Sequence, residues 1–453
     1  MDTAEELIEA WRALLAATET DAHHPLADRE AHLRAELAAL TDYDLSEEEA
    51  WLLAVRRVSD RGRSSDRLDG SDAERLWRQA ALLGSVASPD PAPAPTADHR
   101  WRDALALAIG AAVTIQVARL VAGSTDAGVI WLVRNAALLV LPFLAVYLVR
   151  ASGRTVGERQ VIAAGFLLAA LVVNLYPFTA DSSTGLLVAA HLPVALWALI
   201  GYARFGGGLR HGGSRLDLVR SSGAWAITYV LFALGGGVLV GMTLALLAPI
   251  ARIGPEQVLA WVLPSGAAGA VVIAAWLVGT RPEVVGAVAP MLAAVFTPLF
   301  AVMLVTVTVV YAATGFGGGF DRELLATLDA VLVVVVGLVL FGVASRDPTR
   351  PASWGDRALL VVVIAAMVLD VMVLAVMVGR ITELGLTPNR VAALGLNLVL
   401  LGNLAGTLWH LGRFATGHRG IEPLRSWQTA YLPVLPAWAA VVVVALPPLF
   451  SYA

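Results

Sequence analysis

The chain contains neither cysteine nor lysine, and these two absences exclude several kinds of chemistry. Without cysteine there can be no disulfide, no thiolate nucleophile and no cysteine-bound metal. Without lysine there can be no Schiff-base lysine and no P-loop lysine that binds phosphate. The motifs HExxH and GxSxG are also missing, and the glycine-rich run at 315–320 lacks the flanking strand and helix of a dinucleotide site. We therefore expect a protein that is not an enzyme and has no cofactor or metal.

Charged residues are scarce, at 15% of the chain against 58% hydrophobic residues. Soluble domains usually contain about 25% charged residues. The charges are concentrated before residue 103, and from Ala104 onward long apolar runs alternate with short polar segments. Apolar runs of about 20 residues match the hydrocarbon thickness of a lipid bilayer. The sequence predicts an all-α, multi-pass membrane protein, with no nucleic-acid partner.

The apolar part divides into about eleven candidate transmembrane helices. Their predicted ranges are 103–123, 128–149, 160–177, 184–203, 224–250, 258–279, 288–313, 323–344, 358–379, 388–410 and 429–449. The connections on one side of the predicted membrane contain many more arginines than those on the other side. The positive-inside rule then predicts a cytoplasmic N-terminus and a C-terminus outside the cell.

Residues 1–84 are predicted to form a small soluble helical domain. Ser46 with Glu49 and Ser71 with Glu74 have the spacing of capping boxes, which start helices. The acidic N-terminus is not a signal peptide, so we expect this domain to stay in the cytoplasm. Residues 85–102 form a linker, in which four prolines alternate with small residues and favour an extended spacer. The membrane domain then covers 103–453.

Two segments resemble known families. Residues 27–60, with a SEEEAW helix start followed by VRR, resemble the permease prefix domain, and SDAERLWRQ at 71–79 resembles a segment that often follows it. That bacterial module precedes membrane domains, including transporter permeases. RITELGLTPNR at 380–390 is similar to an uncharacterised inner-membrane family, a domain of unknown function, which implies no activity. The first resemblance implies a module that regulates the membrane bundle or docks partner proteins on it.

The LTPNR segment also has a physical interpretation as the start of a helix. Thr387 can cap the helix, Pro388 fits its first turn, and Gly385 permits the preceding turn. In the alternative interpretation, Asn389 and Arg390 contact a ligand at the outer face.

Four ionisable residues lie inside predicted spans and are candidates for a substrate or ion path: Arg134, His191, Asp329 and Asp370. A charged residue at the middle of a span costs about 2.5–3.5 kcal/mol on insertion scales, so it needs a partner or a wet cavity. We expect Asp370 to approach Arg134 or His191 within hydrogen-bonding reach, directly or through water. The alternative is a structural ion pair that only locks helices together.

Small residues four positions apart predict close helix packing at three places. These pairs are Gly237 with Gly241, Ser265 with Gly269, and Gly402 with Gly406.

Three functions remain open from the sequence. The first is a membrane protein whose cytoplasmic module regulates the bundle or docks a cytoplasmic or membrane partner. The second is a transporter with an outward-facing polar site around Asp370 and Arg134. The third, a membrane enzyme acting on a lipid-linked substrate, has the least support, because no acidic cluster lies on a loop. A cavity reaching Asp370 would favour transport, whereas a sealed Asp370 would favour a scaffold or sensor.

Overall fold

A computed structural model of the chain describes residues 97–179, 182–247, 255–314 and 322–452, with scattered positions before residue 97. The chain divides into two compact units, Met1–Ala94 and Pro95–Ala453. In the first unit, Ile8, Leu33 and Ala54 are buried against one another. The predicted soluble domain, its capping boxes and the linker at 85–102 otherwise lie largely outside the described residues and stay predictions.

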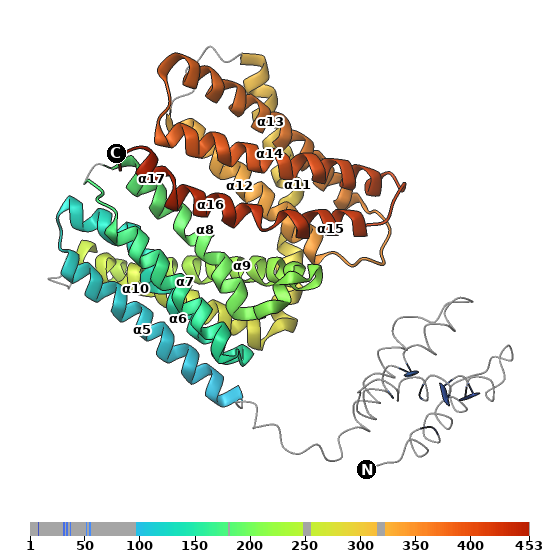
Figure 1. Cartoon of the computed structure of the whole chain (residues 1–453), viewed down its shortest axis with the longest axis horizontal. Coiled ribbons are helices and arrows are strands. Elements are labelled where there is room, and N and C mark those ends of the chain that lie inside the picture. The colour runs from blue at the N-terminus through green and yellow to red at the C-terminus, as the bar shows by residue number, and fades with distance from the viewer. Residues whose placement is uncertain are drawn as a thin grey trace. The chain divides into compact units, whose positions relative to one another are not determined.

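The membrane unit contains eleven helices, among the residues described, that are long and apolar enough to cross a bilayer, as the sequence predicts. Figure 1 shows their arrangement. The first ten are α5 (Ala97–Ala122), α6 (Asp126–Ser152), α7 (Val156–Leu175), α8 (Ser183–Phe205), α9 (Gly212–Leu247), α10 (Pro255–Thr280), α11 (Pro282–Thr314), α12 (Arg322–Ser345), α13 (Trp354–Leu384) and α14 (Pro388–Ala415). A short 3-10 helix, Gly206–Arg210, joins α8 to α9.

The last span is broken into three pieces, α15 (Glu422–Tyr431), α16 (Val434–Val444) and α17 (Leu446–Leu449). Pro433 lies at the first break, where its missing backbone N–H and its ring interrupt a continuous helix. The helical region begins earlier than the predicted 429–449, because α15 has a polar face that the hydropathy pattern does not capture. Helix α9 also begins before residue 224, where the predicted span starts, because its first turns contain the polar residues Arg215 and Arg220.

The bundle has two packed halves. One core joins α5, α6, α7, α8 and α10. A second, larger core joins α9 and α11 to α15. Helices α9 and α16 are among the elements that connect the halves, because α9 packs on both α10 and α12, and α16 packs on both α8 and α14. Figure 1 shows α5, α6 and α10 on one side of the bundle and α12, α13 and α14 on the other.

Three glycines on α14 accept the aromatic side chains of the final span. A Cβ atom added at Gly395, Gly402 or Gly406 would collide with Trp438, Tyr431 or Trp427, respectively. Glycine therefore allows the broken last span to lie directly against α14, which confirms the packing role predicted for Gly402 and Gly406.

The other two predicted small-residue pairs behave differently from each other. On α10, a Cβ atom at Gly269 would touch Ala108 of α5, and Ser265 accepts a hydrogen bond from Gln116 of α5 at 2.8 Å. This pair packs closely, as predicted. On α9, Gly237 and Gly241 have no neighbour within contact distance in the described structure, so the packing predicted for them is wrong. That half of α9 exposes its apolar side chains, as a lipid-facing surface does.

Two arginines form hydrogen bonds between neighbouring helices near one end of the bundle. Arg346, after α12, donates to both carboxylate oxygens of Asp356 in α13, at 2.7 and 2.9 Å. Arg220 of α9 donates to the carbonyl oxygen of Ala344 at 2.7 Å. These residues therefore stabilise the bundle in addition to any effect they have on its orientation.

Candidate functional site

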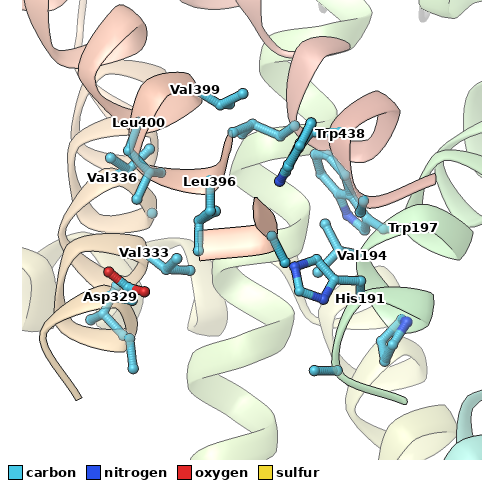
Figure 2. A pocket seen from close by; sticks show the side chains of 18 of the residues that line it. His191, Val194, Trp197, Asp329, Val333, Val336, Leu396, Val399, Leu400 and Trp438 are labelled. Carbon is cyan, nitrogen blue, oxygen red and sulfur yellow. The ribbon is translucent and has the colours of Figure 1, made fainter. Parts of the chain in front are cut away.

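A cavity of about 1520 Å³ lies between the two halves of the bundle. Helices α8, α9, α12, α14 and α16 form most of its walls, and most of the lining side chains are apolar. In Figure 2, the α12 side chains face the α8 side chains across the cavity, with α14 and α16 contributing between them. The labelled residues are Asp329, Val333 and Val336 of α12; His191, Val194 and Trp197 of α8; Leu396, Val399 and Leu400 of α14; and Trp438 of α16.

One end of the cavity is rich in arginine. The starts of α8 and α14 meet at this end of the bundle, beside α17, where Leu187, Ala392 and Leu446 pack together. We call it the α17 end. Arg322 at the start of α12, Arg380 near the end of α13 and Arg390 at the start of α14 all line the cavity there.

The cavity extends along most of the length of α8. Both Ser183, in the first turn of α8, and Arg204, in its last turn, belong to the lining. At 1.5 Å of rise per residue, these two positions are about 30 Å apart, which is close to the hydrocarbon thickness of a bilayer. Arg204 thus places a second cationic group far from the α17 end.

Asp329 is a polar group in the wall formed by α12. It is 9% exposed and lines the cavity. The side-chain amide of Asn397, on α14, donates to its Oδ1 atom at 2.8 Å and also to the carbonyl oxygen of Ala393 at 2.9 Å. This contact fixes the carboxyl group against α14, within the larger core.

His191 lies in the opposite wall. Its Nδ1 atom is 2.9 Å from the carbonyl oxygen of Leu187, one turn earlier in α8. His191 is eight residues from the start of α8 and Asp329 is seven residues from the start of α12. Since both helices start at the α17 end, the two side chains lie at similar depths, about 10–12 Å in. The structure therefore brings these two predicted candidates to one cavity.

Asp370, by contrast, is sealed inside the larger core. Its side chain is 0% exposed, and neither carboxylate oxygen has a hydrogen-bond partner among the described residues. The cavity lining in the described structure includes Asp329 but not Asp370.

Arg134 also lies away from the cavity, in the part of the chain that the structure describes. Its guanidinium group stacks on the ring of Phe178, with the carbon 4.5 Å from the ring centre. The predicted direct hydrogen bond from Asp370 to Arg134 or His191 is therefore wrong. The prediction compared only depth along the membrane normal, whereas Arg134 and Asp370 belong to helices in different halves of the bundle.

The LTPNR segment forms the start of α14, as predicted. Thr387 accepts a hydrogen bond from the backbone N–H of Arg390 at 3.4 Å, and Pro388 occupies the first turn. Gly385 has φ of 78°, in the left-handed region that favours glycine. Arg390 donates to the carbonyl oxygens of Leu384 and Gly385 at 3.0 and 2.7 Å. All four predicted residues, 387–390, also line the cavity, so the alternative of a ligand contact stays open.

The sequence-based candidates omitted two contributors to the site. Asn397 lies at a similar depth to Asp329, and an amide inside an apolar span is a recognisable signal. Arg322 directly precedes the predicted span 323–344, and its place at the cavity becomes visible only once α12 is packed against its neighbours.

These features define a polytopic α-helical membrane protein with a cavity between the two halves of its bundle. No family model, curated protein or solved structure matches the chain. The resemblances to the permease prefix domain and to the uncharacterised inner-membrane family therefore gain no support from these comparisons.

Proposed function

We propose that this protein is a non-enzymatic carrier of the permease type, which binds an amphipathic molecule with an anionic head group. The observation that carries the proposal is the composition of the cavity, with apolar walls and three arginines at its α17 end. Because Asp370 is sealed, it does not meet the criterion given above for a transport site around that residue. The proposal therefore rests on a different polar site, around Arg322, His191 and Asp329.

The size of the cavity favours a ligand with a long apolar part. Pockets for drug-sized ligands measure about 300–1,000 Å³, and this cavity is larger, at about 1520 Å³. Apolar walls such as Val333 and Leu396 suit an acyl chain. Arginine is well matched to carboxylate and phosphate groups, because its planar guanidinium group can donate two parallel hydrogen bonds. A single-chain lipid with a phosphate head group combines both features.

The position of the cavity suits transport. Its facing walls come from different halves, with α8 in one core and α12 and α14 in the other. Many carriers open a site first to one side of the membrane and then to the other by moving one half of the bundle against the other. In this protein, α9 and α16 connect the halves and would carry the hinge regions of such a movement.

A second proposal concerns residues 1–84. We propose that this segment forms a helical module that regulates the carrier or docks a partner protein on it. The supporting observation is that Ile8, Leu33 and Ala54, far apart in the sequence, are buried together. Removing residues 1–84 should leave ligand affinity unchanged but alter the transport rate. An unchanged rate would contradict the regulatory role.

Binding of lysophosphatidate tests the carrier proposal. Radiolabelled lysophosphatidate should bind the purified full-length protein saturably, whereas lysophosphatidylcholine with the same acyl chain should bind more weakly, because its head group has no net charge. Arg322→Gln should weaken lysophosphatidate binding about tenfold or more, the effect of losing one hydrogen bond to a charged group. Arg413→Gln serves as the matched control, since Arg413 stacks on Trp409 and is not part of the described cavity lining.

Filling the cavity provides an independent test. Ala330→Trp places a large side chain in the α12 wall and should abolish binding and protein-dependent transfer across proteoliposomes. Val302→Trp on α11, at a position that is 68% exposed and outside the described lining, should leave both unchanged. Equal binding to all variants, or equal binding of the two lipids, would contradict the proposal.

A further inference from the structure

The cavity contains a further arginine, Arg204, at the end of α8 that lies away from the α17 end. Arg204 is in the last turn of α8 and lines the cavity together with Trp197 and Ile200. The three residues follow one another at spacings of three and four, so they share one face of the helix. Because helical side chains lean toward the N-terminus of their helix, the long Arg204 side chain extends back along α8 toward the middle of the cavity.

Contacts between α8 and α9 fix the level of Arg204 in the bundle. Trp197 donates to the Oγ atom of Ser222 at 2.9 Å, and a Cβ atom added at Gly201 would collide with the side chain of Leu218. Both contacts fit one antiparallel register, in which the α8 number rises by four where the α9 number falls by four. Arg204 therefore lies one turn beyond the contact of Gly201 with Leu218, beside the first turns of α9.

Arg204 differs from neighbouring arginines in having no acceptor for its N–H groups. Arg215 donates to two carbonyl oxygens, at 2.7 and 3.0 Å, and Arg220 donates to the carboxylate of Asp217 at 2.8 Å. Arg204 is partly buried and forms no hydrogen bond or ion pair with the residues that the structure describes; its guanidinium carbon lies 5.6 Å from the ring centre of Phe205. A guanidinium group in a largely apolar wall requires water or an anion to satisfy it.

Acidic residues near this end of the cavity are bound to other partners. Arg154 and Glu158 form an ion pair at 3.5 Å, and both pack against Gly206, two residues after Arg204. The Glu158 carboxylate also caps the start of α7. Like the carboxylate of Asp217, it is therefore engaged elsewhere and does not form an ion pair with Arg204.

We propose that Arg204 is a second anion-binding site of the cavity and that it takes a phosphate group. A guanidinium group can donate two parallel hydrogen bonds to phosphate oxygens, and apolar surroundings strengthen the attraction. This proposal deepens the proposed carrier function and rests on it, because a phosphate head group then has a cationic partner at each end of a cavity about 30 Å long. The same chemistry fits inorganic phosphate, so the experiment has to separate a lipid head group from the free ion.

The absence of cysteine makes one engineered thiol a specific probe of Arg204. Ser221 of α9 lines the cavity, within about two helical turns of Arg204 along the bundle axis in the register described. Its hydroxyl donates to the carbonyl oxygen of Leu218 in the same helix, so Ser221→Cys should leave the helix contacts in place. The full-length variant in detergent is treated with an anionic sulfonatoethyl or a cationic trimethylammonioethyl methanethiosulfonate. The ratio of the two rates cancels any effect of Arg204 on the reactivity of the thiol itself.

In the Ser221→Cys protein, Arg204→Gln should lower the ratio of the anionic to the cationic rate about tenfold, because a positively charged cleft concentrates anions by about that factor or more. Arg204→Lys keeps the charge and should retain most of the ratio. Arg210→Gln is the matched control, since Arg210 is exposed and lies outside the described cavity lining, and it should leave the ratio unchanged. A ratio unaltered by Arg204→Gln would overturn the proposal.

Protection of Ser221→Cys identifies the source of the phosphate and requires no Arg204 variant, so it also serves if Arg204→Gln does not fold. Bound lysophosphatidate should slow the anionic reagent more than the cationic one, whereas an acyl chain that only blocks access slows both equally. Protection by inorganic phosphate but not by lysophosphatidate would support the anion site and contradict the carrier function. Lysophosphatidate binding that depends on Arg322, without selective protection by either compound at Ser221→Cys, would contradict the Arg204 site alone.

Discussion

Asp329 and Asn397 show how a single polar pair can join two membrane helices. Their hydrogen bond, at 2.8 Å, connects α12 to α14 inside the larger core. In an interior of this kind, loss of one partner leaves the other without its hydrogen bond, so the energetic effects of the two residues are coupled.

We therefore predict that Asn397→Leu lowers the free energy of unfolding by roughly 1–3 kcal/mol, because the Asp329 carboxyl group then loses its donor. The double variant Asp329→Leu/Asn397→Leu should cost less than the sum of the two single variants. Chemical unfolding of all four proteins in detergent completes the cycle. Additive effects would show that the contact at 2.8 Å contributes no coupling energy.

The sequence revealed the ionisable residues of the bundle but not their neighbours. It placed His191, Asp329 and Asp370 inside spans, since an ionisable residue in an apolar run is visible in the sequence. It did not show that His191 and Asp329 line one cavity while Asp370 is buried outside the described cavity lining. Hydropathy gives the depth of a residue along the membrane normal, but the neighbour across the bundle depends on how the helices pack.

At the scale of elements, α14 is organised around its glycines. Gly395, Gly402 and Gly406 provide the surface on which α15 and α16 lie, and each receives one aromatic side chain. The spacing of Gly402 and Gly406 predicted this close packing. The glycines of α9 have the same spacing but face open space, so the pattern alone does not distinguish a packed face from a lipid-facing one.

This contrast gives a matched pair of variants. Gly395→Ala should destabilise the protein by about 1–3 kcal/mol, since its new methyl group collides with the ring of Trp438. Gly237→Ala should be neutral or stabilising by up to about 1 kcal/mol, because alanine favours the helix and meets no neighbour. Melting temperatures of the two variants in the same detergent provide the comparison. Similar shifts for both would contradict the packing described for α14.

Helix number and helix starts were predictable for physical reasons. Length and hydropathy are sufficient to find eleven spans, and capping residues such as Thr387 mark where a helix begins. The early start of α9 was not predicted, because polar residues near the membrane surface extend a helix without extending its apolar run. The break at Pro433 was not predicted either.

At the scale of the whole molecule, an odd number of spans places the segment before the first span and the segment after the last span on opposite sides of the membrane. The distribution of arginine predicts a cytoplasmic N-terminus and an external C-terminus. Reporter fusions at Ser88 and at Ala453 should therefore report opposite sides, with the reporter at Ser88 in the cytoplasm. Reports from the same side would mean that one of the eleven helices does not cross the bilayer.

The two halves of the bundle and the cavity between them form the basis of the proposed function. The most direct measurement is crosslinking of the full-length protein with a photoactivatable lysophosphatidate whose reactive group lies on the acyl chain, followed by mapping of the labelled peptides. We predict labelling on α8, α12 and α14 at cavity residues such as Val194, Val333 and Leu396, reduced by excess unlabelled lysophosphatidate and by Ala330→Trp. Labelling confined to outward-facing positions such as Val302 on α11, and insensitive to the competitor, would contradict binding in the cavity.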